Sequence, residues 1–223
     1  MSLNYKQEIK CPKCAHLQEM TLWSSITADD SEDLKKELLG AQINIFRCED
    51  CGQAALVPTP LLYHDKSKKL LISFSPCNDA KEKIRLFEEI KAVSKKSGEL
   101  AEYVDYNLRF VSVYDDLLEK ILIFDNDLND KVIEVLKVLI LSQEPEKIEQ
   151  RIAVFGKIDG EDIEFLIKDT KEKQFYTSKI PMSSYETVKE QLRQSGVKYK
   201  SFDWEIIDID YGAMLLRGAN NNL

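Results

Sequence analysis

Hydrophobic and polar residues alternate in short runs over the first third of the chain. The clearest runs lie at residues 17–26, 42–47, 54–57 and 69–75. Alternation with a period of two is the pattern of strands that bury one face. It predicts a β-rich beginning, in which two close pairs of cysteines stand between strands.

The middle of the chain changes to the three- and four-residue spacing of helices. Residues 79–97 carry spaced apolar side chains among many lysines and glutamates, which predicts a helix with one buried stripe. Two further helices are expected at about residues 112–124 and 130–142, joined as a helical hairpin. The second of these is apolar on most sides, so we expect it to be buried on more than one face.

Three helix starts are predicted by a Ser or Thr that is followed three residues later by an acidic side chain. This capping-box pattern satisfies backbone N–H groups that the first turn of a helix leaves without partners. The pairs are Thr27 with Asp30, Ser112 with Asp115, and Ser183 with Glu186.

Alternation returns after residue 150. Two strands joined by the hairpin turn Asp159-Gly160 are predicted first, then a third strand, a helix from Ser183 and a last strand. The strands are expected at residues 151–158, 161–169, 174–179 and 204–209.

Four of the five cysteines form two C-x-x-C pairs. Cys11 and Cys14 make the first pair, and Cys48 and Cys51 make the second, 33 residues further on. Such a turn places two thiolates on one edge of a tetrahedron, and zinc prefers four soft ligands in that geometry. Gly52 supplies the positive φ that a metal-binding turn often needs. The spacing predicts one structural zinc site, with iron as the alternative metal because rubredoxin-type knuckles share it.

Other roles fit these side chains less well. A thioredoxin-like dithiol needs a single pair that opens a helix, and no helix is expected after Cys14. Four thiolates leave zinc no open coordination position, which argues against a catalytic metal. His16 and His64 are interpreted as surface or hydrogen-bonded histidines, and Cys77 as an inert small residue.

Together these patterns predict an α+β fold. It comprises an N-terminal zinc-ribbon-like β structure, a helical middle and a C-terminal β-β-β-α-β module. Residues 1–146 are expected to form a zinc-binding domain of ribbon plus helical hairpin, and residues 147–223 a small α+β module.

Net charge and the distribution of apolar residues limit the partners and the cellular location that we expect. The chain has 223 residues and a net charge of −8, a balance that disfavours phosphate backbones and anionic lipid surfaces. Its first ten residues lack the apolar region of a signal peptide, and no apolar run approaches the roughly 18 residues of a membrane span. We therefore expect a cytoplasmic protein without a membrane partner, whose cysteines are metal ligands or free thiols.

Four stretches of the sequence carry a family resemblance. They are CPKC at residues 11–14, FRCEDCG at 46–52, PLLYHD at 60–65 and EKILIFDNDLNDKVIEVLK at 119–137. They resemble the CpXC family of bacterial and archaeal proteins, which is named for two Cys-Pro-x-Cys motifs. The second motif departs from that pattern, because Glu49 stands in place of the proline. The resemblance covers roughly residues 9–142 and implies zinc binding but no particular activity, and residues 151–223 are then an added module.

Three functions are compatible with the sequence, and no oligomeric state is predicted. The leading hypothesis is a non-enzymatic, zinc-stabilised protein that binds another protein, since the cysteine set is closed and no catalytic motif is present. The second is a nucleic-acid-binding ribbon with basic side chains near the knuckles, namely Lys6, Lys10, Lys13, Arg47, Lys66, Lys68 and Lys69. The third is an enzyme that uses carboxylates of the last predicted strand, Asp203, Glu205, Asp208 and Asp210, for which a solvated strand face is the simpler interpretation.

Overall fold

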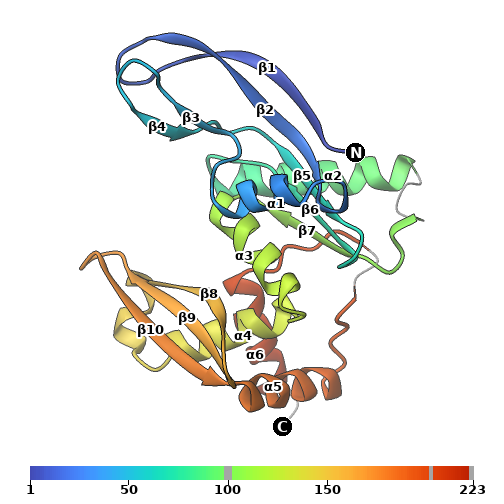
Figure 1. Cartoon of the computed structure of the whole chain (residues 1–223). Coiled ribbons are helices and arrows are strands. Elements are labelled where there is room, and N and C mark those ends of the chain that lie inside the picture. The colour runs from blue at the N-terminus through green and yellow to red at the C-terminus, as the bar shows by residue number, and fades with distance from the viewer. Residues whose placement is uncertain (98–101, 201–202, 221–223) are drawn as a thin grey trace. The chain divides into compact units, whose positions relative to one another are not determined.

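The computed structural model describes residues 1–97, 102–200 and 203–220. The first elements are β1 Leu3–Lys10, β2 Leu17–Thr27, η1 Ala28–Asp30, α1 Glu32–Leu39, β3 Ile45–Arg47, β4 Ala54–Leu56, β5 Leu61–Asp65, β6 Leu70–Phe74 and α2 Ala80–Ser97 (Figure 1). Then follow β7 Asn107–Val111, α3 Tyr114–Asp125, α4 Asp130–Leu141, η3 Pro145–Gln150, β8 Arg151–Asp159, β9 Asp162–Asp169, β10 Gln174–Pro181, α5 Met182–Gln194 and α6 Ile209–Asn220. The predicted α+β class is confirmed. None of the described helices combines the length and the hydrophobicity that a membrane crossing needs.

The chain divides into two compact units. The first comprises Met1–Leu118 with Ser201–Glu205, and the second comprises Glu119–Lys200 with Ile206–Leu223. The boundary therefore lies within α3, and α4 packs in the second unit against β8, α5 and α6. Compactness and independent folding are different properties, so the division into domains 1–146 and 147–223 stays a prediction.

A five-stranded sheet in the order β1-β2-β5-β6-β7 forms the first unit. β1 and β2 pair along their whole length, but β2 pairs with β5 only through Ser25–Thr27 and Leu62–His64. The rest of β1 and β2 is a two-stranded arm that continues beyond the other strands, with the first cysteine pair in the loop at its tip (Figure 1). The hairpin of β3 and β4 is a separate two-stranded sheet that carries the second cysteine pair.

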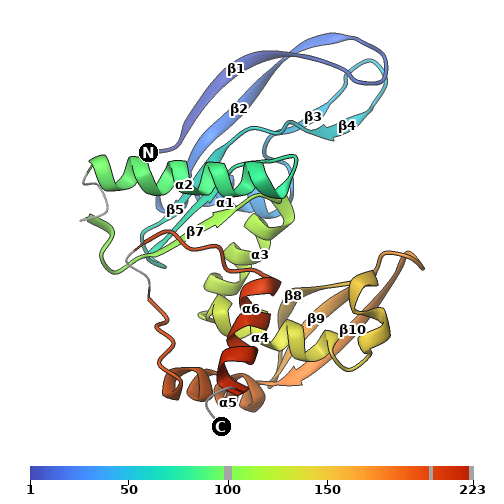
Figure 2. The same cartoon turned by 180° about the vertical axis from the view of Figure 1, so that it is seen from behind.

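The core of the first unit lies on both faces of β5, β6 and β7. Tyr63, Ile72 and Phe74 are buried on one face, and Leu71 and Leu108 on the other. The helix α2 covers one face of the sheet with Phe87 and Ile90 (Figure 2). This core is distant from the cysteines along the arm, and so a different interaction must hold the tip.

The chain returns to the first unit near its end. Trp204 is buried against Leu71 and Leu108, and its indole N–H donates to Ser94 Oγ at 2.9 Å. Glu205 forms an isolated parallel bridge with Arg109 of β7 and accepts a hydrogen bond from that fully buried guanidinium at 3.0 Å. Residues that follow the family-like stretches therefore complete the first unit.

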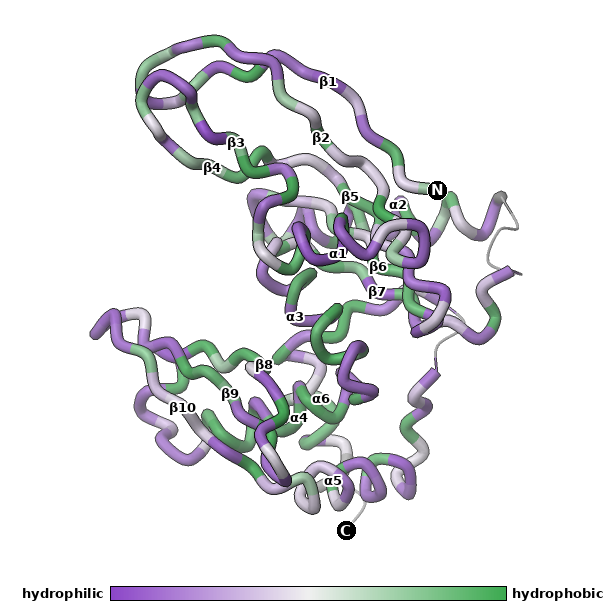
Figure 3. The backbone as a smooth tube through the Cα atoms, in the orientation of Figure 1, coloured by the Kyte–Doolittle hydropathy of each residue, from purple (hydrophilic) through white to green (hydrophobic). Residues whose placement is uncertain are grey.

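The second unit is built on the antiparallel sheet β10-β9-β8. Alternate side chains of β8 and β9, among them Phe155, Ile163 and Phe165, are buried against α4 and α5. Gly160 has a φ of 64°, as the predicted hairpin turn requires. Figure 3 shows the contrast with the arm, because β1 is largely hydrophilic whereas β8 and β9 carry long hydrophobic stretches.

A network of buried charges links α3 to α4 in this unit. Lys120 lies 2.8 Å from Glu134 and 3.5 Å from Asp130, while Lys137 lies 3.0 Å from both Glu119 and Glu134. Burial lowers the pKa of Lys120, but the carboxylates of Glu134 and Asp130 outweigh it and hold that pKa above its usual value. The stretch 119–137, singled out above by its resemblance, contains all five side chains.

Three local predictions are wrong. Thr27 makes no capping bond; Ser31 instead starts α1 by accepting from the N–H of Leu34. The helix α5 begins after Pro181 without a side-chain cap, so Ser183 and Glu186 form no capping box. The last strand is absent, since residues 204–209 make only the bridge at Glu205 before α6 begins.

Candidate metal centre

The first cysteine pair lies in the loop between β1 and β2. The N–H of Cys11 donates to the carbonyl of His16 at 2.8 Å, and the N–H of Ala15 donates back to the carbonyl of Cys11 at 3.0 Å. Ala15 has a φ of 62°, in the left-handed region that non-glycine residues seldom adopt. These bonds turn the chain tightly and bring Cys14 next to Cys11.

The second pair lies in the loop between β3 and β4 and repeats this arrangement position by position. The N–H of Cys48 donates to the carbonyl of Gln53, and the N–H of Gly52 to the carbonyl of Cys48, both at 2.9 Å. Gly52, with a φ of 69°, occupies the place of Ala15. The second loop, which has Glu49, therefore makes the same backbone hydrogen bonds as the first loop, which has Pro12 at the matching position.

The four sulfur atoms converge. All lie within 4.8 Å of one another; Cys11 Sγ is 3.7 Å from Cys51 Sγ, and Cys14 Sγ is 3.5 Å from Cys48 Sγ. A tetrahedron with metal–sulfur bonds of about 2.3 Å has edges of roughly 3.8 Å, whereas a disulfide bond is about 2.05 Å long. The spacing fits four thiolates around one metal ion, and the structure brings together all four predicted ligands.

Backbone N–H groups point at the sulfur atoms. Burial raises the pKa of Cys11, but hydrogen bonds from the N–H groups of Cys14 and Lys13 outweigh it and lower that pKa to about 6. The N–H of His16 favours the Cys14 thiolate, yet burial and the neighbouring sulfur atoms raise its pKa to about 12. Since a metal binds thiolates, binding here must release protons, and the affinity must rise with pH.

Two amide side chains connect the knuckles to the arm. Gln18 donates from Nε2 to the carbonyl of Arg47 and accepts at Oε1 from the N–H of Glu49, both at 2.9 Å. The buried Asn44 accepts from the N–H of Trp23 at 2.8 Å and donates to its carbonyl at 2.9 Å, as a strand partner would. The sequence analysis singled out neither residue, because an isolated Asn or Gln carries no spacing signal.

The apolar shell of the centre is small. Phe46 is buried with Cys11 and Cys48, and Ile9, Met20, Cys51 and Val57 pack around them. So few apolar side chains stabilise little structure by burial alone. The geometry therefore makes metal coordination the main candidate for what holds the tip.

The other singled-out side chains near the cysteines lie outside the cluster. His64 packs edge-on against Tyr103, and its Nε2 is 3.3 Å from the hydroxyl of Tyr106. His16 contributes its backbone carbonyl to the first knuckle. Cys77, a free cysteine, lies between β6 and α2 and is not part of the four-sulfur cluster.

The basic side chains of the nucleic-acid hypothesis are divided between two places. Lys10, Lys13 and Arg47 lie at the knuckles, whereas the lysines at residues 66–69 lie in the turn between β5 and β6. Because β5 runs parallel to β2, that turn is at the end of the sheet away from the knuckles. Lys6 is paired with Glu19 at 2.6 Å, so the predicted seven do not form one cluster.

The acidic side chains of the enzyme hypothesis do not share a strand face. Asp203 lies 3.6 Å from both Lys91 and Lys95. Glu205 is bound to the buried Arg109, as described above. Asp208 accepts from the N–H of Tyr211 at 3.1 Å and so caps α6, whose first turn contains Asp210. These contacts give the carboxylates roles within the fold.

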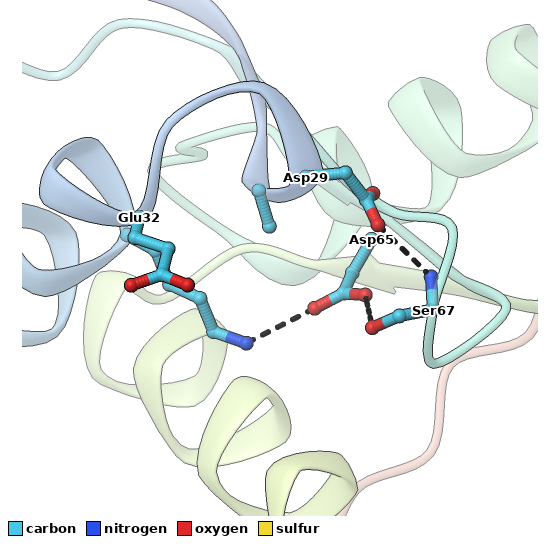
Figure 4. Close-up of a pocket in the computed structure, with 6 residues that line it drawn as sticks. Asp29, Glu32, Asp65 and Ser67 are labelled. Atoms are coloured by element: carbon cyan, nitrogen blue, oxygen red, sulfur yellow. Dashed lines mark hydrogen bonds and ion pairs between the residues drawn. The ribbon is translucent and has the colours of Figure 1, made fainter.

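A polar pocket of about 340 Å³ lies in the first unit, away from the cysteines (Figure 4). Its lining residues are Ala28, Asp29, Glu32, Lys35, Asp65 and Ser67. Asp65 accepts from Lys35 Nζ at 3.0 Å and from Ser67 Oγ at 2.6 Å, while Asp29 accepts from the N–H of Lys66 at 2.7 Å. These polar groups fasten the turn between β5 and β6 to η1 and α1.

Comparison with known proteins identifies a family. The family described as CpXC protein matches residues 9–137, more than half of the chain. No protein with a curated description and no solved structure matches. The matched segment contains both cysteine knuckles, the turn at Asp65 and the buried charges of α3 and α4. The chain is therefore a member of the CpXC family, and its four cysteines form a candidate metal-binding site.

Proposed function

We propose that Cys11, Cys14, Cys48 and Cys51 bind one zinc ion in a structural role, and that this zinc-stabilised region is a non-enzymatic module that binds another protein. The observation that carries the proposal is the pair of matched knuckles, which present four sulfur atoms at the edge length of a zinc tetrathiolate. Four protein ligands leave no position for a substrate, so the metal organises the fold and does not itself act on a substrate.

The surface of the arm supports a protein partner. Leu17, at 53% exposure, follows the first knuckle directly and pairs with Lys10 in the strand register. An exposed apolar side chain among polar neighbours at the tip is a contact point for a protein partner. The net charge of −8 disfavours a nucleic acid at the same place.

Metal analysis of the purified chain tests the zinc site. We expect about one zinc and no iron for each chain, and loss of the metal in Cys48→Ser. Cys77→Ser is the matched control, because it removes the cysteine outside the cluster, and it should keep the full metal content. Iron in the purified protein, or full zinc content in Cys48→Ser, would contradict the zinc proposal.

Capture of partners by the immobilised chain, with nuclease present, tests the second part. A protein retained by the wild type and by Cys77→Ser, but lost from Leu17→Asp and Cys48→Ser, supports a binding surface on the zinc-held arm. Retention by all four baits, or release of every partner by nuclease, contradicts it.

A further inference from the structure

The C-terminal sheet has one open edge. β10 is its outermost strand and is paired only on the β9 side among the described residues (Figure 1). The opposite edge strand, β8, is partly closed, because the carboxylate of Glu119 accepts from the N–H of Phe155 at 2.6 Å. An open edge presents a row of backbone donors and acceptors to another strand.

β10 lacks most of the features that protect edge strands. Such strands usually carry charges, proline or a bulge. The segment from Gln174 to Ser178 is uncharged and pairs with β9 without a bulge. The one charged residue of the strand, Lys179, forms an exposed ion pair with Asp159 of its own sheet at 2.6 Å. Pro181 stands only at the last position.

The outer face of this sheet is apolar beside that edge. Phe175 is 71% exposed, Leu166 45% and Ile152 51%. In the strand register, Phe175 and Ile152 flank Lys168, and Leu166 lies between Val154 and Thr177 in the next row. The apolar side chains thus reach the open edge, where a new strand would extend the covered surface.

We propose that two copies of this chain associate through β10, which pairs antiparallel with its counterpart about a two-fold axis at Thr177. A continuous sheet with both sets of helices on one face requires paired residue numbers of equal parity, because successive side chains alternate between faces. A two-fold at Thr177 meets this condition. The two three-stranded sheets then form one sheet of six strands.

Charge favours this register over an axis at Tyr176. With the axis at Thr177, Phe175 of one copy faces Lys179 of the other, so a cation lies beside an aromatic ring twice. An axis at Tyr176 instead opposes Lys173 and Lys179, two like charges. The uncharged centre of β10 is complementary to itself, which is what an isologous dimer contact requires. The inference concerns the second unit and does not depend on the zinc proposal.

Sedimentation of the full chain over a wide concentration range tests this dimer. We expect the wild type to dimerise, and Thr177→Lys or Thr177→Glu to raise the dissociation constant at least about tenfold, since each places like charges opposite each other. An equimolar mixture of the two variants should dimerise again, because Lys then faces Glu. That recovery also shows that both variants are folded.

Thr187→Lys is the matched control. Thr187 lies on the exposed side of α5, and its hydroxyl donates to the carbonyl of Ser183 in the same helix. This variant should dimerise as the wild type does. A wild type that stays monomeric, variants that dimerise normally, or a mixture that fails to recover would each overturn the two-fold contact at Thr177 and leave the edge to a different partner.

Discussion

The knuckle region and the C-terminal sheet are both β structures, but they are stabilised in different ways. β3 and β4 have 3 residues each, and the cluster at their end buries Phe46 of β3 with Cys11 and Cys48. β8 and β9 have 9 and 8 residues and bury Phe155, Phe165 and Ile163 against helices. Strands that are too short and too polar to bury much surface need another source of stability, and under the zinc proposal coordination of the metal supplies it.

The two regions should therefore respond to different perturbations. The C-terminal sheet depends on side chains packed between sheet and helices, so substitutions there should act without changing metal content. The knuckles depend on four sulfur atoms and a few backbone hydrogen bonds, so they should be sensitive to metal and insensitive to the distant core. The predictions below use this separation.

The largest single-residue effect is expected at Lys120. Lys120→Met removes a buried cation from beside the buried carboxylates of Asp130 and Glu134, while Lys137 still pairs with Glu134. The loss should destabilise the second unit by about 3–5 kcal/mol. Urea unfolding, with hydrogen exchange in β8 and β9 as the readout, measures this loss of stability. The metal content of the protein should stay unchanged. Lys157→Met, on the exposed side of β8, is the control, and an equal loss there would contradict the role of the buried network.

A smaller effect is expected at Asn44. Asn44→Ala removes two hydrogen bonds to the backbone of Trp23. It also puts alanine at a φ of 57°, which asparagine tolerates better. Together these changes should lower the free energy of unfolding by about 2 kcal/mol. The loss should appear as faster hydrogen exchange around β2 and β3, with little change in β8. Asn4→Ala, at an exposed position of β1, should be nearly neutral.

Acid should loosen the turn between β5 and β6 through Asp65. Burial raises the pKa of this carboxyl, but hydrogen bonds from Ser67, Lys35 and the N–H of Lys68 outweigh it, so the folded pKa lies below the usual 3.8. The stabilisation is thus present above the unfolded pKa and is lost as pH falls through the folded pKa. Stability measured against pH should show this loss in the wild type, and Asp65→Asn should lack it.

The smallest effects are expected from two substitutions that compare the knuckles directly. Ala15→Gly should stabilise the first loop by about 0.5–1 kcal/mol, because glycine adopts a φ of 62° without strain. Gly52→Ala should destabilise the second loop by a similar amount, since its Cβ meets no neighbour and only backbone strain opposes it. Competition with a chelator measures both, and changes of the same sign would contradict the equivalence of the knuckles.

The sequence was most informative where a pattern maps onto one physical constraint. The spacing of two C-x-x-C pairs is recognisable without any knowledge of the surrounding fold, so all four candidate ligands were predicted, and they are together in the structure. Alternate side chains of β8 and β9 are buried on one face, and both strands with their turn were predicted closely. Repeated apolar residues likewise placed α4 as a buried helix.

Predictions failed where the structure of a segment depends on contacts that its local sequence pattern does not reveal. β1 was not predicted, because LNYKQEIK is exposed at almost every position and Gln7 interrupts the alternation of Leu3, Tyr5 and Ile9. The strand at 204–209 was predicted from its alternation, yet only Glu205 meets the edge of β7, and Asp208 caps a helix instead. Asn44 and Gln18 act through contacts that only the folded chain creates.

Hydrogen exchange of the full chain with and without zinc tests the central claim most directly. We predict that chelation greatly accelerates exchange at the amides of Cys11, Ala15, Cys48 and Gly52, whose hydrogen bonds define the knuckles. Exchange at Phe165 and its neighbours in β9 should not change. Protection of the knuckles that is the same with and without zinc would contradict a structural metal, and so would a parallel loss of protection in β9.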